Sequence, residues 1–310
     1  MLYQLSLTIY IKIIVKNYQL LECWEKKIKV TLNELQHNAN KQTKDVKVTY
    51  RQELANRYLG NFVSCSDIAG YINLLKDKDI KIIDKNRSVI LTCNGKAVGA
   101  VIRDVALKPV SNHFGAKMKV TVKAHYPLNR GKEHSSFGTM VGHGIRENIT
   151  TIPTFNYSYN KKLGPNAQKI FDNDGNTLAK WLFENSKRYI PFATSSYEEF
   201  KAKVELDDDN LIGAVFCAKN YEAAGHIDDD RSEYAIGYVY KEGTVKEGHF
   251  FYPEYGVAIE MTSNSIWCWL PQSVHGIAKL DLSKGGTRYT AAISLTEKTA
   301  RSIEKRSTFV

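Results

Sequence analysis

The last hundred residues consist almost entirely of short β-branched and aromatic runs, and this pattern restricts the fold more than any other feature. Seven such runs follow Asn210, at spacings typical of an all-β sandwich or barrel. Turn-forming triplets separate them, such as Lys241–Gly243, Ser263–Ser265 and Lys284–Gly286. We therefore predict a double-sheet jelly roll or a similar barrel, built from LIGAVFCAK, AIGYVYK, HFFYPEY, GVAIEM, SIWCWLP, VHGIAKL and TRYTAAISL.

Strands and helices are also expected ahead of this region, where helices would cover one face of the main sheet. Between Lys81 and Val122, the segments IKII, SVILT, AVGAVIRDVAL and MKVTV have the composition of strands. Helical spacing predicts a helix over Asn166–Arg188, broken at the insert FDNDGN, and a second over Tyr197–Val204. A short helix is expected to begin at Ser66, which is a favourable N-cap residue.

The length of 310 residues and the 43% apolar content suit a chain that folds without disulfides or structural metals. We expect a basic, partly helical N-terminal extension over residues 1–80 and a second domain over residues 81–310, with its β-rich core at about 210–296. The predicted fold class is therefore α+β, an all-β core with flanking helices and an N-terminal α/β extension. The apolar segment Leu2–Val15 contains Lys12 and is too short to span a membrane, so we expect no membrane partner.

The cysteines indicate a reducing environment. There are five, an odd number, and none lies within four residues of another. A disulfide framework or a CxxC zinc site is therefore not expected. This usage predicts an intracellular protein of the nucleus or the cytoplasm.

Charge is distributed unevenly along the chain. Residues 1–150 contain 24 Lys and Arg against 12 Asp and Glu, whereas residues 151–310 contain 19 against 21. Such an excess is typical of a surface that neutralises nucleic-acid phosphates, although a surface that only keeps the protein in solution fits equally well. Arg130 and Lys132 stand near His125, Tyr126 and Phe137, and interleaved cations and rings suit nucleic-acid binding. A plain loop is equally compatible.

Four residues of the β-rich half form a pattern with chemical meaning. Side chains alternate along an extended segment, so His226 and Asp228 point to the same face and can bind one metal ion. His275 follows 47 positions after Asp228, beyond the intervening strands, and completes a set of two imidazoles and one carboxylate. This set leaves three coordination positions open on non-haem Fe(II). Arg288 comes 13 residues later and can hold a carboxylate through two parallel hydrogen bonds.

This ordered pattern resembles that of the Fe(II)/2-oxoglutarate-dependent dioxygenases, over roughly residues 110–296. The resemblance implies a double-stranded β-helix core, with Fe(II) bound by the catalytic residues His226, Asp228 and His275 and with 2-oxoglutarate and O2 as cosubstrates. Arg288 would hold the far carboxylate of 2-oxoglutarate. The reaction implied is oxidation of a substrate C–H bond, with 2-oxoglutarate converted to succinate and CO2. A hydrogen bond to 2-oxoglutarate is also expected from one residue among Asn220, Tyr238 and Tyr240.

Two segments narrow the resemblance. EGHFFYPEYGVAIEMTSNSIWCWLPQSVHG is similar to the TET/JBP-like and fungal branch, and AHYPLNRGKEHSSFGTMVGHG is similar to a segment ahead of the core in fungal members. That branch implies oxidation of a methyl group on a nucleic-acid base such as 5-methylcytosine, which an enzyme must flip out of a duplex. We expect DNA rather than RNA, and no protein partner. Glu247 and Gly248 replace a glycine pair that is frequent there, and the cysteine-rich zinc region of animal TET proteins is absent.

Other acidic and aromatic residues of this half are expected to have structural roles. Asp229 and Asp230, like Asp207–Asp209, are predicted to be solvated turn residues. Trp267 and Trp269 point to one face of a predicted strand. They either pack in the core, which we favour, or form a wall of the active cavity.

A metal-binding role is not expected for His249, because the triad is already complete. His249 is predicted to lie in the core or at the mouth of the barrel. His134 and His143 flank a glycine-containing loop and are predicted to lie at the surface, although both could line the substrate entrance.

Two other functions stay open on the sequence. The protein could hydroxylate a protein side chain or a small metabolite, in which case the basic N-terminal half would be incidental. Alternatively, a cupin-like module could hold metal without turnover. Release of succinate from 2-oxoglutarate, with and without methylated DNA, separates the three functions.

Overall fold

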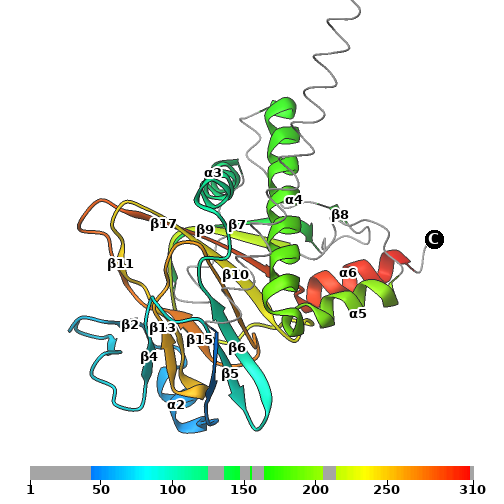
Figure 1. The fold of residues 1–310 in the computed structure, drawn as a ribbon. Helices are drawn as coiled ribbons and strands as arrows, with labels where there is room; N and C mark the ends of the chain where they lie inside the picture. The colour runs from blue at the N-terminus through cyan, green and yellow to red at the C-terminus, as the bar shows by residue number, and fades with distance from the viewer. Residues whose placement is uncertain (1–42, 125–135, 147–153, 156–163, 205–213, 308–310) are drawn as a thin grey trace, which may run out of the picture.

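The computed structural model describes residues 43–124, 136–146, 154–155, 164–204 and 214–307, and its centre is a 13-stranded mixed sheet (Figure 1). The order is β1-β5-β6-β14-β10-β17-β9-β15-β12-β13-β4, and β7 pairs with both β8 and β9. The strands of this sheet are β1 (Lys44–Lys47), β4 (Lys81–Ile83), β5 (Val89–Cys93), β6 (Lys96–Ile102), β7 (Ser136–Arg146), β8 (Thr154–Phe155), β9 (Ala214–His226), β10 (Ala235–Glu242), β12 (Phe250–Tyr252), β13 (Val257–Ile259), β14 (Ser265–Trp269), β15 (His275–Ile277) and β17 (Thr287–Ser294). Two small sheets pair β2 (Val63–Ser64) with β3 (Ile72–Asn73) and β11 (Lys246–Glu247) with β16 (Leu280–Asp281).

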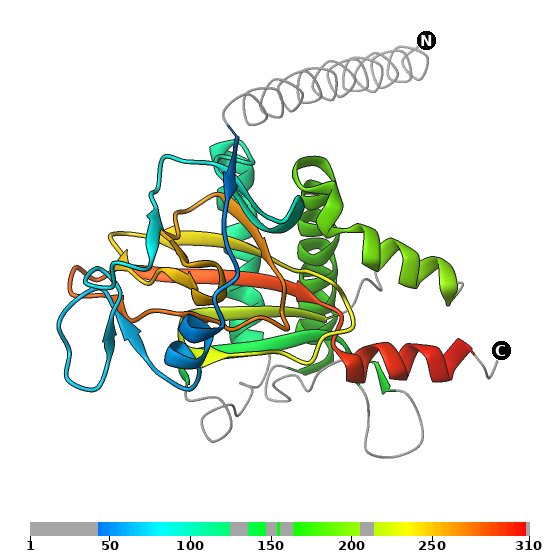
Figure 2. The ribbon, with the colours of Figure 1, turned by 90° about the horizontal axis from the view of Figure 1, so that it is seen from below.

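Helices pack against one face of this sheet. In Figure 1, α3 and α4 lie above it, and in Figure 2 α5 and α6 extend beyond the same end of it. The α-helices are α2 (Gln52–Tyr58), α3 (Lys108–Ala124), α4 (Gly164–Tyr189), α5 (Ser195–Lys203) and α6 (Glu297–Ser307), and the short 3-10 turns are η2 (Pro191–Ala193) and η3 (Pro253–Tyr255).

Both faces of the sheet are buried, as the residues of the central strand β10 show. Its residues alternate, so Tyr238 points toward the helices whereas Val239 points into the concave side, and both are fully buried. On the concave side, Leu91 of β5 and Phe250 of β12 belong to one apolar cluster, although six strands lie between them in the sheet order. The sheet must therefore curl back on itself. This confirms the predicted fold class, a double-stranded β-helix core with flanking helices.

Most of the strands expected after residue 210 are confirmed, and so are those at IKII, SVILT and the first part of AVGAVIRDVAL. The expected strand MKVTV is wrong, because it lies inside α3. Phe114, Met118 and Val122 recur every four residues there and are buried against the helix-facing side of the sheet. Burial of this helical stripe outweighs the strand preference of the β-branched residues.

Two expected helix features are also wrong. The insert FDNDGN does not interrupt α4, where Gly175 allows close approach of His143, since a Cβ atom there would lie 2.5 Å from the imidazole. No helix begins at Ser66: the chain turns at Gly70, with φ of +80°, and enters β3. Asn73 Oδ1 then accepts hydrogen bonds from the backbone of Leu75 and Lys76, which is turn geometry. The helix over Tyr197–Val204 is confirmed as α5.

The N-terminal part of the described chain joins the main sheet at two places. β1 pairs in parallel with β5, and β4 pairs in parallel with β13. The domain boundary near residue 80 stays a prediction, and Leu2–Val15 lies outside the described residues. Among the helices described, none has the length and apolar character needed to cross a bilayer.

Candidate metal centre and active site

Three predicted metal ligands meet where β9 and β15 lie side by side. His226 ends β9, His275 begins β15, and the two are paired in the antiparallel register. Asp228 follows in the loop after β9, where its backbone N–H donates to Pro271 O at 2.8 Å. The strand pairing and this loop contact together bring residues 47 positions apart in the sequence into one cluster.

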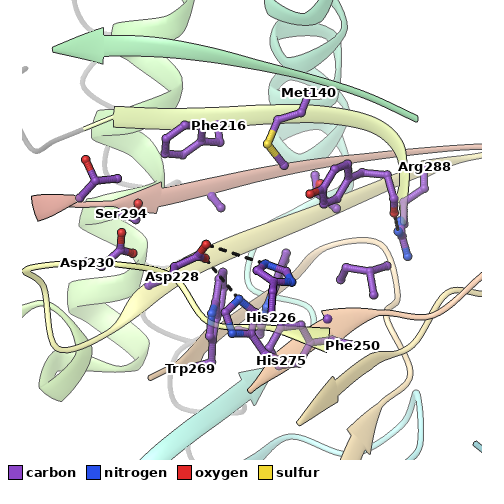
Figure 3. Close-up of a pocket in the computed structure, with 18 residues that line it drawn as sticks. Met140, Phe216, His226, Asp228, Asp230, Phe250, Trp269, His275, Arg288 and Ser294 are labelled. Carbon is purple, nitrogen blue, oxygen red and sulfur yellow. Dashed lines mark hydrogen bonds and ion pairs between the residues drawn. The ribbon is translucent and has the colours of Figure 1, made fainter. Parts of the chain in front are cut away.

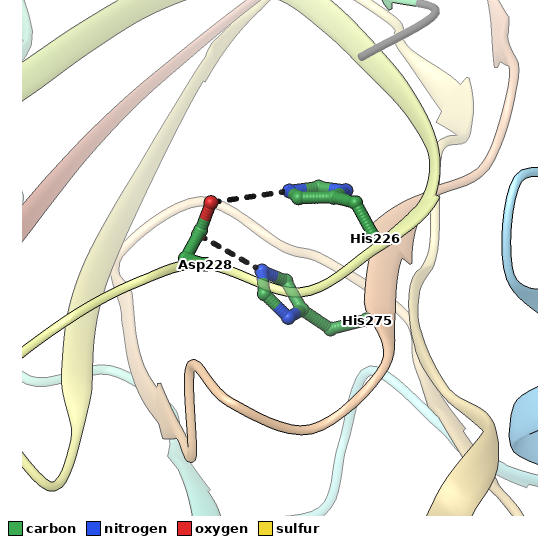
Figure 4. A group of neighbouring side chains, drawn as sticks. All are labelled: His226, Asp228 and His275. Atoms are coloured by element: carbon green, nitrogen blue, oxygen red, sulfur yellow. Dashed lines mark ion pairs between the residues drawn. The ribbon is translucent and has the colours of Figure 1, made fainter. Parts of the chain in front are cut away.

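The donor atoms of the triad converge (Figure 4). Asp228 Oδ1 lies 3.8 Å from His226 Nε2, and Asp228 Oδ2 lies 3.3 Å from His275 Nε2. One atom of each residue can be chosen so that all three lie within 4.8 Å of one another, and no other such group of three or more occurs among the described residues. The spacing suits one metal ion with a face left open to other ligands.

Backbone carbonyls fix both imidazole rings. His226 Nδ1 donates to Ala224 O at 2.8 Å, and His275 Nδ1 donates to Ser273 O at 2.9 Å. A ring that donates from Nδ1 keeps the lone pair of Nε2 for a metal. Phe250 and Trp269 pack on His275, with ring centroids 5.9 and 5.5 Å away, and hold it in place.

The triad opens into a cavity of about 110 Å³, which is lined by 18 residues (Figure 3). Arg288, on β17, lies at one end and is 1% exposed. Its Nη1 donates to Gly248 O at 2.6 Å and its Nη2 to Tyr221 O. Gly248 has a φ of +68° and leaves space for the Arg288 guanidinium, because a Cβ atom at this position would lie 2.5 Å from Arg288 Nη1.

The buried Arg288 guanidinium has no carboxylate within ion-pair distance among the described residues. Burial lowers the pKa of Arg288 to about 10, and the charge of Glu222 only partly offsets this effect. A buried cation without a direct counter-ion is costly, which favours an anionic ligand at this end of the cavity.

Three buried N–H groups of residues in the cavity wall find no acceptor among the described residues: Arg288 Nε, Trp267 Nε1 and Trp269 Nε1. Leaving such a donor unpaired costs about 1–3 kcal/mol, so this wall suits a ligand rich in oxygen acceptors. The triad supplies two imidazole nitrogens and a carboxylate, a donor set that suits Fe(II). The residues therefore fit Fe(II) together with a dicarboxylate such as 2-oxoglutarate.

The three residues considered for a hydrogen bond to 2-oxoglutarate do not line the cavity. Tyr238 points to the helix face, where its hydroxyl lies 2.7 Å from Ser111 Oγ, and Tyr240 packs against α3 on the same side. Asn220 has a positive φ of 48°, and its Oδ1 accepts the backbone N–H of Arg288 at 2.8 Å. Its position supports a role in orienting β17. The expected hydrogen bond to 2-oxoglutarate is therefore corrected for Asn220 and Tyr238, and for Tyr240 as well.

The other sequence expectations have mixed outcomes. His249 is buried beside Cys65, as predicted for a core residue, with Cys65 Sγ 3.1 Å from His249 Nδ1. The prediction that His143 lies at the surface is wrong: His143 is 3% exposed, and its Nε2 lies 2.8 Å from Asn176 Oδ1. Trp267 and Trp269 both pack in the core and line the cavity. The predicted nucleic-acid contacts Arg130 and Lys132, as well as His134, lie outside the described residues.

Sequence reasoning missed one end of the cavity. Asp230, expected to be a solvated turn residue, is 4% exposed and lines the cavity with Ser294 and Phe216. A signal for Ser294 was present, because alternation along β17 places it on the same face as Arg288. Asp230 carried no such signal, since a run of three aspartates is ordinarily a turn.

Comparison with known proteins gives distant structural similarity. No protein-family model matches the chain, and neither does any curated protein. The solved structures that match include NgTET1 in complex with 5mC DNA, at 11% identity and a TM-score of 0.47, over 73% of this chain and 84% of that chain. They also include a 2OG-Fe(II) oxygenase family oxidoreductase from Burkholderia pseudomallei, at 9% identity and a TM-score of 0.33 over 63% and 82% of the two chains. A Pseudomonas putida prolyl-4-hydroxylase matches at 10% identity and a TM-score of 0.35, over 64% and 93%. These similarities are too distant to indicate a reaction, so the chemistry rests on the side chains of the cavity.

Proposed function

We propose that this protein is an Fe(II)- and 2-oxoglutarate-dependent dioxygenase that oxidises a methyl group on a nucleic-acid base such as 5-methylcytosine. The observation that carries the proposal is the cavity itself, which contains a two-histidine, one-carboxylate cluster and a buried arginine with no ion-pair partner among the described residues.

His226, Asp228 and His275 would hold the iron. Both histidines present Nε2 because their Nδ1 atoms donate to backbone carbonyls, and Asp228 adds one negative charge. Three ligands leave positions open for a cosubstrate and O2. When bound, iron, 2-oxoglutarate and O2 supply the oxidising chemistry, with 2-oxoglutarate converted to succinate and CO2.

Arg288 would orient the cosubstrate. Its guanidinium is fixed by two backbone carbonyls, so it offers a preorganised cation to a carboxylate that reaches in from the metal. Trp267 and Trp269 would donate further hydrogen bonds from the same wall. The apolar surroundings of Phe250 exclude water around His275 and strengthen these charge interactions.

A nucleic-acid substrate is supported by charge rather than by contacts. The excess of Lys and Arg in residues 1–150 would neutralise nucleic-acid phosphates. Much of that basic half lies outside the described residues, including Arg130 and Lys132.

The test is succinate release from 2-oxoglutarate by the full chain with Fe(II), measured with methylated DNA, with the same unmethylated DNA and without DNA. The proposal predicts that methylated DNA stimulates release and that hydroxymethylated base accumulates in step. If only peptides or metabolites stimulate release, the nucleic-acid substrate is wrong. If iron binds but no substrate causes turnover, the protein is a metal-binding module instead.

A further inference from the structure

The three members of the triad are not held in the same way. His226 and His275 belong to two paired strands, whereas Asp228 lies in the loop between β9 and β10 (Figure 4). The Asp228 side chain is 30% exposed, so packing alone does not fix its carboxylate. The position of this carboxylate relative to the two imidazoles therefore depends on the contacts that hold the loop.

The residue after β17 and the first residue of α6 hold this loop through the backbone. Leu295 O accepts the backbone N–H of Arg231 at 2.7 Å, and Asp229 O accepts that of Glu297 at 3.0 Å. Glu297 is the first residue of α6. These bonds place the first turn of the helix against the residues that directly follow Asp228.

A side-chain ion pair reinforces the same junction. Arg231 Nε donates to Glu297 Oε2 at 2.6 Å, and Arg231 Nη2 donates to Glu297 Oε1 at 2.8 Å. Hydrogen bonds from Arg231 and from Arg301 lower the pKa of Glu297 to about 2, so this carboxylate is charged at neutral pH. Two parallel hydrogen bonds fix both the distance and the angle between the two side chains, which a single bond does not.

We infer that Arg231 is a positioning residue of the metal centre: its fork to Glu297 ties the loop to α6 and so holds the Asp228 carboxylate toward the two imidazoles. This inference rests on the proposed function, and it makes α6 a part of the molecule that the metal site requires. Neither Arg231 nor Glu297 lines the cavity, so the effect passes through the backbone of the loop. Groups that orient metal ligands from outside the coordination sphere change metal affinity by about 10–100-fold when they are removed. We expect the lower end of this range, because Arg231 acts on Asp228 indirectly.

The experiment measures Mn(II) affinity of the full chain from the electron paramagnetic resonance signal of free Mn(II), without cosubstrate or substrate. Arg231→Ala should bind Mn(II) about tenfold more weakly than the wild type. Loss of a nearby cation would by charge alone strengthen binding of a divalent ion, so the sign of the change separates positioning from simple electrostatics. Arg231→Lys keeps the charge but loses the fork, and its affinity should fall between the two. Equal affinity in wild type and Arg231→Ala overturns the inference while leaving the metal assignment intact.

Glu297→Ala removes the other half of the pair and tests the same contact if Arg231→Ala does not fold. It should weaken Mn(II) binding to a similar extent, and the double variant should be no weaker than the weaker single variant. Fully additive losses would overturn the inference, because the two side chains would then act independently.

Arg301→Ala is the matched control. Arg301 Nε donates to Glu297 Oε1 at 3.0 Å, but this pair lies within α6, so its loss removes an ion pair without releasing the loop. Arg301→Ala should keep wild-type Mn(II) affinity, and urea unfolding should show similar stability for Arg231→Ala and Arg301→Ala. Equal weakening of Mn(II) binding in both variants would overturn the inference. If the wild type itself does not bind Mn(II), the metal assignment and the proposed function fail, and this inference fails with them.

Discussion

At the scale of single residues, backbone carbonyls set the orientation of the two histidine rings of the triad. No carboxylate is needed to accept the Nδ1 hydrogen bond of either ring. Ala224 O and Ser273 O fix the rings of His226 and His275. Asp228 is then the only negative charge among the three ligands, and its side chain is 30% exposed. Removing it should weaken metal binding strongly without opening a packed core.

We predict that Asp228→Ala binds iron at least about tenfold more weakly and loses turnover, because two neutral imidazoles hold a divalent ion poorly. Metal analysis after dialysis measures the loss, and circular dichroism checks that the fold is kept. Asp229→Ala removes an exposed neighbouring carboxylate and should retain both iron and activity. Wild-type iron content in Asp228→Ala would show that the ligand assignment is wrong.

Arg288→Lys should raise the KM for 2-oxoglutarate by about tenfold or more while changing substrate affinity little. Lysine keeps the positive charge but loses the planar fork that two carbonyls now hold in place. Arg301→Lys, at a 61% exposed side chain on α6, is the matched control. An unchanged KM for 2-oxoglutarate in Arg288→Lys would show that another residue binds the far carboxylate of 2-oxoglutarate.

His249 should make the protein sensitive to mild acid. Burial lowers the pKa of His249 from 6.5 to about 4; the charge of Glu260 opposes this effect, and the charges of Lys241, Arg288 and Arg103 add to it. Between these values the unfolded chain binds a proton that the folded chain does not, so stability falls as pH falls from about 6.5 to 4.

The loss attributable to His249 is about 3 kcal/mol of unfolding free energy at pH 4, and none is expected above about pH 6.5. Urea unfolding from pH 4 to 7.5 measures it. His249→Gln removes the titrating group, so its stability should depend less on pH in that window. Parallel pH profiles for wild type and His249→Gln would contradict this account.

At the scale of elements, a helix or strand could be predicted from the sequence where its local residue pattern agrees with the way it is buried in the fold. The strands after residue 210 alternate as a two-faced sheet requires, and His226, Asp228 and His275 are recognisable because few residue types bind metal. In α3, β-branched residues indicated a strand, but burial of one helical stripe decided otherwise. The burial of Asp230 could not be predicted from the sequence, because residues distant in the chain bury that carboxylate and no local pattern signals it.

Gly175 within α4 should be intolerant of alanine, contrary to the usual preference of helices for alanine. The added Cβ would meet the His143 ring at 2.5 Å, where α4 packs on β7. Overpacking of this kind typically costs about 1–3 kcal/mol. Thermal or urea unfolding of Gly175→Ala measures the cost, and an increase in stability would show that the helix and strand are not packed as described.

At the scale of the whole molecule, the basic half of the chain predicts salt-dependent binding to nucleic acid. If about six phosphates are neutralised, log K should fall with log salt with a slope near −5 on duplex DNA. Changing Arg130 and Lys132 together to alanine should make the slope shallower by up to about two. An affinity that does not change between about 50 and 200 mM salt would contradict nucleic-acid binding by this basic half. A protein or metabolite substrate would then be favoured.

The most direct test of the whole account is whether the triad and Arg288 form one site. Calorimetric titration of the full chain with 2-oxoglutarate, with and without Mn(II) as a redox-inert substitute for Fe(II), measures this. Chelation by the metal should add to the Arg288 contact, so we predict one binding site at least about tenfold tighter with Mn(II) than without it. Equal affinity with and without the metal, or no binding at all, would contradict the account.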